Sequence, residues 1–336
     1  MQSRAPQRTG RWPHRRAVCA ALLLLTVVAA ACGGGSSTPA AAGRWTVAHP
    51  EPSTNPAGYS SIYGVSCTGP SFCVAVDESG DAIQWNGSRW STPQPVTAGN
   101  TLESVSCTSS TFCMALAGQQ AVRFNGTTWS MSTAVGPAPS SPTGGQYRVS
   151  CTSPTFCASV NTAGVVTTFN GTTWGHDIQV DDGTATRPVQ DISCASASSC
   201  VVVSATGNIA TLRGTVWSHQ SSPGQSLLHS VSCPTTTFCM ALDLTGHALV
   251  SDGSTWTPAQ AMPGFGSLTY SVSCATASHC VAARSDGSVS TWQSGSWSQP
   301  LAVLHDGTLA TARISCPTTA FCALVDSSGS VATYRG

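Results

Sequence analysis

Cysteine is the residue type whose spacing in this chain points most clearly to a chemical role. Fourteen of the 16 cysteines form seven pairs, each with five residues between its members. Zinc-binding pairs usually have about two to four intervening residues, so this spacing does not fit zinc. So many paired cysteines predict a disulfide framework in an oxidising compartment, with a redox or metal-binding role as the alternative. The predicted disulfides are Cys67-Cys73, Cys107-Cys113, Cys151-Cys157, Cys194-Cys200, Cys233-Cys239, Cys274-Cys280 and Cys316-Cys322.

A second group of candidate residues precedes the first cysteine of each pair. Three of the five tyrosines stand four residues before that cysteine, and a glutamate and a histidine take the same position in other copies. The position three residues before it carries two arginines and an aspartate. Aromatic rings with a few polar groups are typical of a site for a carbohydrate or a peptide. The candidate ligand-binding residues are Tyr63, Glu103, Tyr147, Arg148, Asp191, His229, Tyr270 and Arg313.

These residues also have a purely structural explanation. Tyrosine suits the beginning of a strand, and Arg148, Asp191 and Arg313 would then form an ion pair inside the protein. Two adjacent carboxylates, Asp181 and Asp182, are too few for the about six to eight oxygens of a calcium site. The histidines show no metal-ligand spacing, and the chain has no phosphate-binding loop or nucleophile elbow. We therefore predict no catalytic residue, no metal and no cofactor.

The candidate residues belong to a repeat. A segment beginning V-S-C or I-S-C occurs seven times, and successive copies begin 39 to 44 residues apart. This period is typical of a propeller blade, whose four short strands must stack on neighbouring blades to bury their two faces. The sequence therefore predicts an all-β fold, a closed seven-bladed β-propeller with four-stranded blades.

Each copy divides into strands that we name a to d. Strand a carries the first cysteine and strand b the second, a turn with glycine leads to strand c, and strand d carries a tryptophan. Pairs such as Asn86-Gly87 and Asp252-Gly253 predict two-residue hairpin turns between strands c and d. We expect the tryptophans to pack between blades, with sugar stacking as the alternative. They are Trp45, Trp90, Trp129, Trp174, Trp217, Trp256 and Trp297.

The two ends of the repeat region complement each other. Residues 43 to 47, G-R-W-T-V, match the end of a copy, whereas the seventh copy stops at Tyr334-Arg335-Gly336, before its own strand d. Residues 44–48 are therefore expected to complete the last blade, which closes the ring and pairs strand edges that would otherwise be exposed.

The first 31 residues predict a signal peptide. Five arginines are followed by the apolar run from Ala17 to Ala31, which is short for a membrane span. The run Ala29-Ala30-Ala31-Cys32 resembles a bacterial lipobox, with ordinary secretion as the alternative, and Arg15-Arg16 leaves twin-arginine export open. We predict lipidation at Cys32, a flexible tether over 32–43 and a propeller over 44–336.

The charge of the exported chain limits its partners. Removing five of the 14 arginines leaves nine against 14 carboxylates, a net charge of −5, and the chain has no lysine. Such a surface lacks the basic patch that binds nucleic acid or anionic lipid. Membrane contact is therefore expected only through the lipid anchor. We expect a monomer.

The repeat, with S-C-x5-C, an apolar strand and an N-G-x-x-W turn, resembles the cysteine-stapled propellers of secreted actinobacterial lipoproteins, loosely related to sialidase or Asp-box propellers. That resemblance implies the fold. Sialidases also use an arginine triad, a Tyr/Glu pair and an acidic residue, which only Arg148, Arg284, Arg313, Tyr147 and Glu103 could imitate here, outside any family motif. We expect a surface-anchored, non-catalytic binding domain for an extracellular glycan or protein. The alternatives are a sialidase-like glycoside hydrolase or lyase and a structural cell-envelope lipoprotein.

Overall fold

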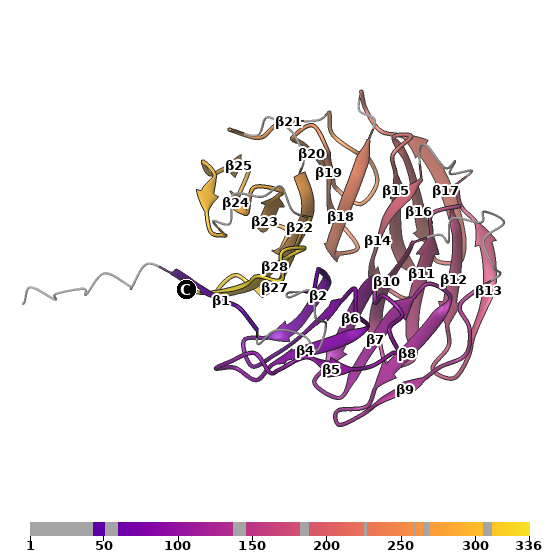
Figure 1. The fold of residues 1–336 in the computed structure, drawn as a ribbon. Coiled ribbons are helices and arrows are strands. Elements are labelled where there is room, and N and C mark those ends of the chain that lie inside the picture. Colours follow the sequence, from indigo (N-terminus) through magenta and orange to yellow (C-terminus); the bar gives the residue numbers. More distant parts are fainter. Residues whose placement is uncertain are drawn as a thin grey trace, which may run out of the picture. The chain divides into compact units, whose positions relative to one another are not determined.

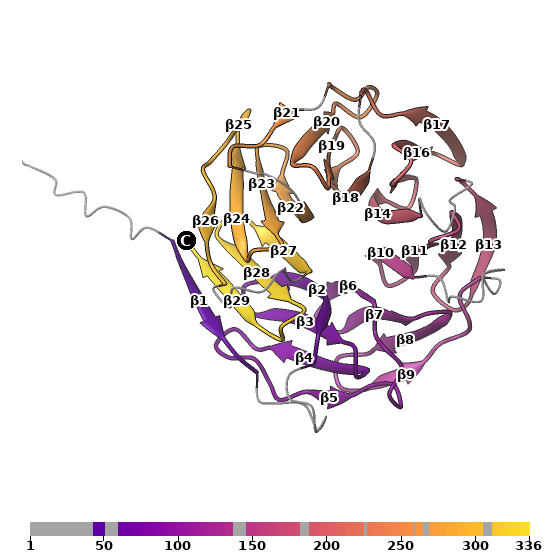
Figure 2. The ribbon, with the colours of Figure 1, turned by 45° about the horizontal axis from the view of Figure 1, so that its top comes forward.

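The computed structural model describes residues 43–50, 60–136, 146–181, 188–224, 227–258, 260–264, 269–304 and 311–336, with the side chains of 269 and 270 left out. Residues Ala41–Gly336 form one compact unit. Seven antiparallel sheets lie around a ring, as the sequence predicts (Figures 1 and 2). Within the described ranges, no helix has the length and apolar character needed to cross a membrane.

Strands a lie innermost and strands d outermost (Figure 2). Strands a are β2 (Ile62–Gly69), β6 (Ser104–Ser109), β10 (Tyr147–Ser153), β14 (Val189–Ser196), β18 (Leu228–Thr235), β22 (Thr269–Thr276) and β27 (Ala312–Thr318). Strands b are β3 (Phe72–Asp77), β7 (Phe112–Ala117), β11 (Phe156–Asn161), β15 (Ser199–Ser204), β19 (Phe238–Asp243), β23 (His279–Arg284) and β28 (Phe321–Asp326). We number the blades 1 to 7 in this order.

The outer half of each blade consists of strands c and d. Strands c are β4 (Asp81–Trp85), β8 (Gln120–Phe124), β12 (Val165–Phe169), β16 (Asn208–Arg213), β20 (His247–Ser251), β24 (Ser288–Gln293) and β29 (Val331–Arg335). Strands d are β5 (Gln94–Pro95), β9 (Trp129–Met131), β13 (Trp174–Gln179), β17 (Val216–Ser221), β21 (Gln260–Ala261), β25 (Ser296–Trp297) with β26 (Leu301–Ala302), and β1 (Arg44–Ala48).

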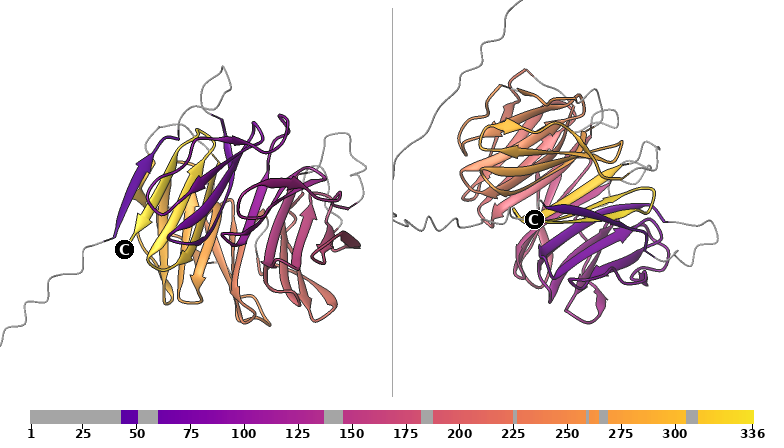
Figure 3. Two further views of the ribbon diagram at one scale, coloured as in Figure 1. Left: turned by 90° about the horizontal axis from the view of Figure 1, so that it is seen from below. Right: turned by 90° about the vertical axis from the view of Figure 1, so that its left-hand side faces the viewer.

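The last blade joins the two ends of the repeat region. Strand β1 pairs with β29 along its whole length, with Trp45 opposite Tyr334 and Ala48 opposite Val331. The first strand and the C-terminal strands lie side by side in Figures 2 and 3. The predicted completion of blade 7 by residues 44–48 is confirmed, and it leaves no blade without its fourth strand.

Each a–b hairpin carries one disulfide between neighbouring strands. All seven predicted disulfides are present, and in five blades the two cysteines face each other directly in the strand register. On the loop-entropy model, closing so short a loop stabilises the fold by roughly 2 kcal/mol per bridge. The framework also indicates an oxidising environment outside the cytoplasm.

The c–d turns differ from the prediction in four blades. Trp85 faces Trp90 across a four-residue loop, and the corresponding loops of blades 2, 3 and 5 have the same length. In blade 1, Asn86 Oδ1 accepts hydrogen bonds from the backbone N–H groups of Ser88 and Arg89, so the side chain holds the turn and only Gly87 takes a positive φ of 92°. The predicted two-residue turn is wrong there and occurs only in blades 4 and 6.

Apolar cores lie between the blades. The tryptophan in or just before every strand d packs against one of these cores, which confirms the packing prediction. In blades 1, 2, 3, 6 and 7 it also lies beside an aromatic residue near the end of strand c; Phe169 and Trp174, for example, have ring centroids 5.4 Å apart. A phenylalanine from the preceding blade, such as Phe112, completes this core.

Candidate functional site

A ring of serine hydroxyls ties the seven inner strands together. The serine that precedes the first cysteine of a blade accepts a hydrogen bond from the backbone N–H of the corresponding cysteine in the next blade, at 2.9 to 3.0 Å. Ser315 of blade 7 accepts from Cys67 of blade 1, so the ring of bonds closes. The pairs are Ser66 and Cys107, Ser106 and Cys151, Ser150 and Cys194, Ser193 and Cys233, Ser232 and Cys274, Ser273 and Cys316, and Ser315 and Cys67.

A second tier of such bonds lies two residues earlier in the inner strands. Ser104 Oγ accepts from Val149 N–H at 3.1 Å, and Ser230 Oγ accepts from Val272 N–H at 3.1 Å. Ser271 does the same for Ile314 at 3.3 Å. At this level Asp191 replaces serine in blade 4 and arginine replaces it in blades 3 and 7, so this tier departs from the repeat.

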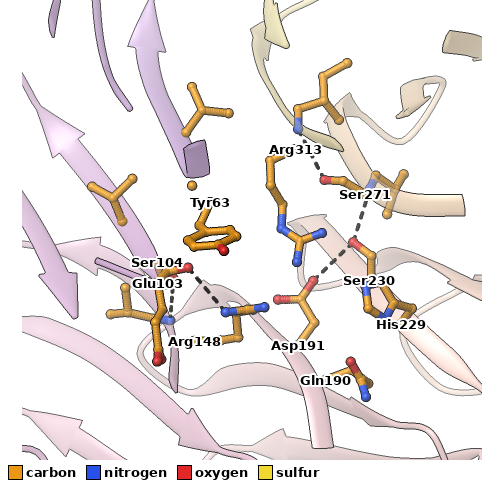
Figure 4. Close-up of a pocket in the computed structure, with 16 residues that line it drawn as sticks. Tyr63, Glu103, Ser104, Arg148, Gln190, Asp191, His229, Ser230, Ser271 and Arg313 are labelled. Atoms are coloured by element: carbon orange, nitrogen blue, oxygen red, sulfur yellow. Dashed lines mark hydrogen bonds between the residues drawn. The ribbon is translucent and has the colours of Figure 1, made fainter. Parts of the chain in front are cut away.

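A polar pocket of about 150 Å³ lies at this second tier, and all seven inner strands or the residues just before them contribute to its wall. Six of the eight predicted ligand-binding residues line it: Tyr63, Glu103, Arg148, Asp191, His229 and Arg313. Figure 4 shows the arginine side chains of blades 3 and 7 reaching toward the aspartate of blade 4. The shared position of these residues in or just before the inner strands therefore brings together most of the predicted ligand-binding residues.

A one-residue difference in strand pairing decides which residues reach this pocket. In β2, β14, β18 and β22 the pairing with strand b skips the residue four places before the cysteine. The skipped residues are Tyr63, Gln190, His229 and Tyr270, and the first three line the pocket. A skipped residue of this kind is a β-bulge, which redirects a side chain away from the regular alternation of the strand.

Tyr147 lies elsewhere because β10 has no such bulge. It pairs directly with Asn161, and its side chain is 3% exposed in the core between blades 2 and 3. Ala312 has the same arrangement in β27 and is also buried. Both therefore occupy the core position that Ile62 takes in a bulged strand, so Tyr147 does not line the pocket. The side chain of Tyr270 lies outside the described residues.

Asp191 is held by three hydrogen bonds from two blades. Its Oδ1 accepts from its neighbour Ile192 N–H at 2.9 Å, and its Oδ2 accepts from Val231 N–H at 3.0 Å and Ser230 Oγ at 3.1 Å. Burial raises the pKa of this carboxyl, while the Val231 hydrogen bond and the positive charges of Arg148 and Arg313 counteract the rise. The carboxylate thus acts as a structural link between blades as well as a charge in the pocket.

Glu103 and Arg148 form a second link, between blades 2 and 3. Glu103 Oε2 accepts from Tyr147 N–H at 2.7 Å, and Arg148 Nη1 donates to the Glu103 carbonyl at 3.3 Å. Burial raises the pKa of Glu103, against the effects of that backbone bond and of the arginine. Arg148 Nη1 also donates to the Tyr147 carbonyl at 3.4 Å, so these two bonds engage one end of a guanidinium group that has five N–H donors and lines the pocket.

His229 is neutral at pH 7. Burial lowers the pKa of its imidazole to about 3, and the positive charges of Arg313 and Arg148 lower it further in the same direction. The charged groups around the pocket are thus two arginines, which stay protonated at all ordinary pH values, and two carboxyls whose ionisation is opposed by burial.

Sequence reasoning omitted four polar residues from the candidate site. Gln190 lines the pocket at the blade 4 bulge, and Ser104, Ser230 and Ser271 line it while accepting backbone hydrogen bonds from the next blade. A signal for the bulge exists in the residue five places before the cysteine. It is apolar in the bulged blades 1, 4 and 5, but it is polar in the bulged blade 6 (Thr269) as well as in the two unbulged blades (Gln146 and Thr311), so it marks the bulge only in part.

Three buried aspartates outside the pocket have structural roles. Asp77, Asp243 and Asp326 are the last residues of their strands b, are at most 2% exposed and accept backbone hydrogen bonds within the b–c turn. Asp182 lies outside the described residues, and among the residues that are described no cluster of three or more His, Cys, Asp or Glu could hold a metal ion.

The set that could imitate a sialidase is not assembled at the pocket. Arg284 does not line it; its Nη1 donates to the Gly264 carbonyl at 2.8 Å and its Nη2 lies 3.5 Å from Asp286. Tyr147 lies in a core between blades. Of the five residues, Glu103, Arg148 and Arg313 come together.

Comparison with known proteins shows the fold. No protein-family model and no curated protein sequence matches the chain. A structure of YCF48 bound to D1 peptide is 15% identical, with a TM-score of 0.65 over 87% of this chain and 95% of that one. YCF48 from Cyanidioschyzon merolae is 14% identical, with a TM-score of 0.64 over 87% and 98%. The WD40 propeller domain of Doa1 is 14% identical, with a TM-score of 0.65 over 86% and 97%.

Proposed function

We propose that this protein is an exported, non-catalytic binding module whose central pocket receives an acidic group from a peptide segment of a partner protein. The proposal rests on one observation: Arg148 and Arg313 line a pocket whose two carboxylates already accept backbone hydrogen bonds. A guanidinium presents a fork of N–H donors that matches a carboxylate.

The balance of charge supports an acidic ligand. The two arginines keep their charge at all ordinary pH values, whereas burial raises the pKa of Asp191 and of Glu103, and both carboxyl groups already accept backbone hydrogen bonds. His229 contributes a neutral ring, because burial holds its pKa at about 3. A carboxylate that enters the pocket gains two cationic partners, and the serines and Gln190 add neutral hydrogen-bonding groups around it.

The size of the pocket favours a peptide over a glycan. Its volume of about 150 Å³ is below the range of about 300–1,000 Å³ that small-molecule sites usually have. Such a space suits the end of one side chain or a chain terminus. Tyr63 is the one aromatic residue among the described residues that line it, which gives a sugar ring little surface for stacking. YCF48, a propeller of similar fold, has been seen with a peptide.

The test compares two peptides that differ only in charge. A fluorescein-labelled Gly/Ser peptide with one central Glu, and the same peptide with Gln, are titrated into the intact protein and followed by fluorescence polarisation. The Glu peptide should bind more tightly by about tenfold or more, and Arg148→Met or Arg313→Met should remove that preference.

Arg89→Met is the matched control, because Arg89 is exposed in the c–d turn of blade 1 and does not line the pocket. It should leave both affinities unchanged. Equal binding of the two peptides would reject the acidic anchor. Binding of neither peptide would favour the alternative of a structural envelope protein.

The proposal includes attachment to the membrane by a lipid on Cys32, which lies outside the described residues. The disulfide framework is consistent with a position outside the cytoplasm. Cys32→Ser should move the protein from the membrane fraction to the medium. Cys19→Ser, which changes the other cysteine outside the seven pairs, should leave it in the membrane fraction. An unchanged distribution of the Cys32 variant would reject the anchor.

A further inference from the structure

A cleft of about 500 Å³ lies at the seam between blades 6 and 7, away from the central pocket. We call it the seam 6–7 cleft. Its aromatic residues are Trp297 of blade 6 and Trp45 and Tyr334 of blade 7, and His279, Val289 and Leu301 of blade 6 also line it. The rings of Trp45 and Tyr334 lie 5.5 Å apart, so they form one continuous aromatic wall.

The cleft lies at a seam where one residue of the repeat is different. The residue just before the second cysteine is phenylalanine in five blades, and it packs against the strand c and strand d side chains of the next blade. Phe72, for example, stacks on Phe124 at 6.3 Å, and Phe321 lies 6.4 Å from Trp85. The five are Phe72, Phe112, Phe156, Phe238 and Phe321.

The two blades that lack this phenylalanine leave clefts. Blade 6 has His279, which lines the seam 6–7 cleft, and blade 4 has Ser199, which lines a smaller cavity of about 40 Å³ beside Trp256. Both cavities therefore lie at seams where phenylalanine is replaced. The larger cavity has three aromatic rings in its wall, and blade 6 supplies no phenylalanine to pack against them.

The walls of the seam 6–7 cleft carry no permanent charge among the described residues. Polar contributions come from neutral side chains such as Thr291 and Gln293, and burial lowers the pKa of His279, which favours its neutral form. No charged side chain among these residues could form a salt bridge with a ligand, and the cleft differs in this respect from the central pocket. At other seams, a phenylalanine ring fills the equivalent space.

We infer that the seam 6–7 cleft is a second binding site, which takes an aromatic side chain of a partner protein in the place that phenylalanine occupies at five other seams. The site does not depend on the central pocket. Edge-to-face or offset contacts with Trp45, Tyr334 and Trp297 would add to the burial of the ring. Leu301, which is 56% exposed, stands at the cleft wall, where a partner would cover it.

The experiment uses the intact protein and two neutral peptides, acetyl-Gly-Phe-Gly-amide and acetyl-Gly-Ser-Gly-amide. Binding is followed by NMR through the indole N–H signals of Trp45 and Trp297. The Phe peptide should shift both signals, and the Ser peptide should not. His279→Phe fills the cleft from within and should weaken the response to the Phe peptide by at least about tenfold.

Ser199→Phe is the matched control, because it makes a similar change at seam 4–5 and should leave the response intact. Leu301→Glu, at an exposed site, provides a second variant that should weaken the response even if His279→Phe misfolds. Equal shifts with both peptides, or an undiminished response in both cleft variants, would overturn the inference. A response to methyl β-glucoside and not to the Phe peptide would also overturn it, in favour of a sugar site.

Discussion

The central pocket and the seam 6–7 cleft depart from the repeat in different ways. At the centre, charged residues replace serine, yet Asp191 still accepts the backbone hydrogen bond that a serine accepts in other blades. At the seam, His279 replaces a phenylalanine and lines a cavity of about 500 Å³. The centre is therefore polar and firmly bonded, whereas the seam is apolar and underpacked.

This contrast shows how a repeat protein can gain sites without losing its fold. The serine ring and the disulfides recur in all seven blades and hold the ring together. Residues at other positions can then differ from their counterparts in other blades, and such residues line the central pocket and the seam 6–7 cleft. The four predictions below test whether the two regions differ as described.

The largest expected effect follows removal of the central carboxylate. Asp191→Ala leaves the Val231 and Ile192 N–H groups without their acceptor and removes the negative charge between two arginines. We expect a loss of roughly 3–5 kcal/mol in the free energy of unfolding, as for a broken buried charge network. Urea denaturation under oxidising conditions measures it. Asp191→Asn should lose less, and a loss below about 1 kcal/mol in Asp191→Ala would contradict the bonding role.

The histidines of the two regions should respond differently to acid. His229 has its folded pKa lowered to about 3 from 6.5, so its contribution to stability is present above pH 6.5 and is lost as the pH falls toward 3. His229→Gln should therefore be less sensitive to acid than the wild type, by roughly 2–3 kcal/mol at pH 4. The pKa of His279 is lowered by burial alone, so His279 should titrate at a higher pH than His229 in an NMR titration. The reverse order would contradict the contrast.

The disulfides should contribute equally beside the cleft and away from it. Replacing Cys316 and Cys322 by Ala removes a bridge whose Cys322 lines the cleft, and replacing Cys107 and Cys113 removes one from blade 2. Both loops have a sequence separation of 6, so each change should cost roughly 2 kcal/mol through the unfolded chain. Thermal unfolding of both double variants measures the cost. Unequal losses would mean that the cleft wall depends on its bridge.

The smallest effect should be a gain. His279→Phe places in the cleft the ring that other seams contain, and it should raise the free energy of unfolding by about 1 kcal/mol because apolar surface is buried. Ser199→Phe at the smaller cavity should gain less or lose stability through crowding. Differential scanning calorimetry compares the two. A loss of stability in His279→Phe would mean that the cleft is not a vacant phenyl position.

Most of the fold could be predicted from the sequence because each copy repeats the same local signals. The seven S-C segments predicted the number of blades, and the spacing of the cysteines predicted the disulfides. Trp45 precedes the first complete copy, whereas the last copy lacks its own tryptophan, and this predicted the pairing of Trp45 with Tyr334. The c–d turns were harder. Asn-Gly suits a two-residue turn, but the Asn86 side chain satisfies the backbone of a longer loop.

The candidate site was predicted only in part because it depends on one-residue shifts between strands. Aligning the copies on cysteine gave Tyr63 and Tyr147 the same position, whereas a bulge sends the first to the pocket and its absence leaves the second in the core. The seam 6–7 cleft was missed because it arises from a missing contact. Comparing His279 with Phe238 and Phe321 across the copies would have indicated it.

The most direct test of the central claim is an NMR titration of the intact protein with the Gly/Ser peptide that carries one Glu, observed at the ring of His229. His229 lines the pocket together with Arg148 and Arg313, so its signals should shift with the Glu peptide and stay unchanged with the Gln peptide. The indole signals of Trp45 and Trp297 should not move in either titration. Equal shifts with both peptides, or shifts at the two tryptophans alone, would contradict a pocket that selects an acidic group.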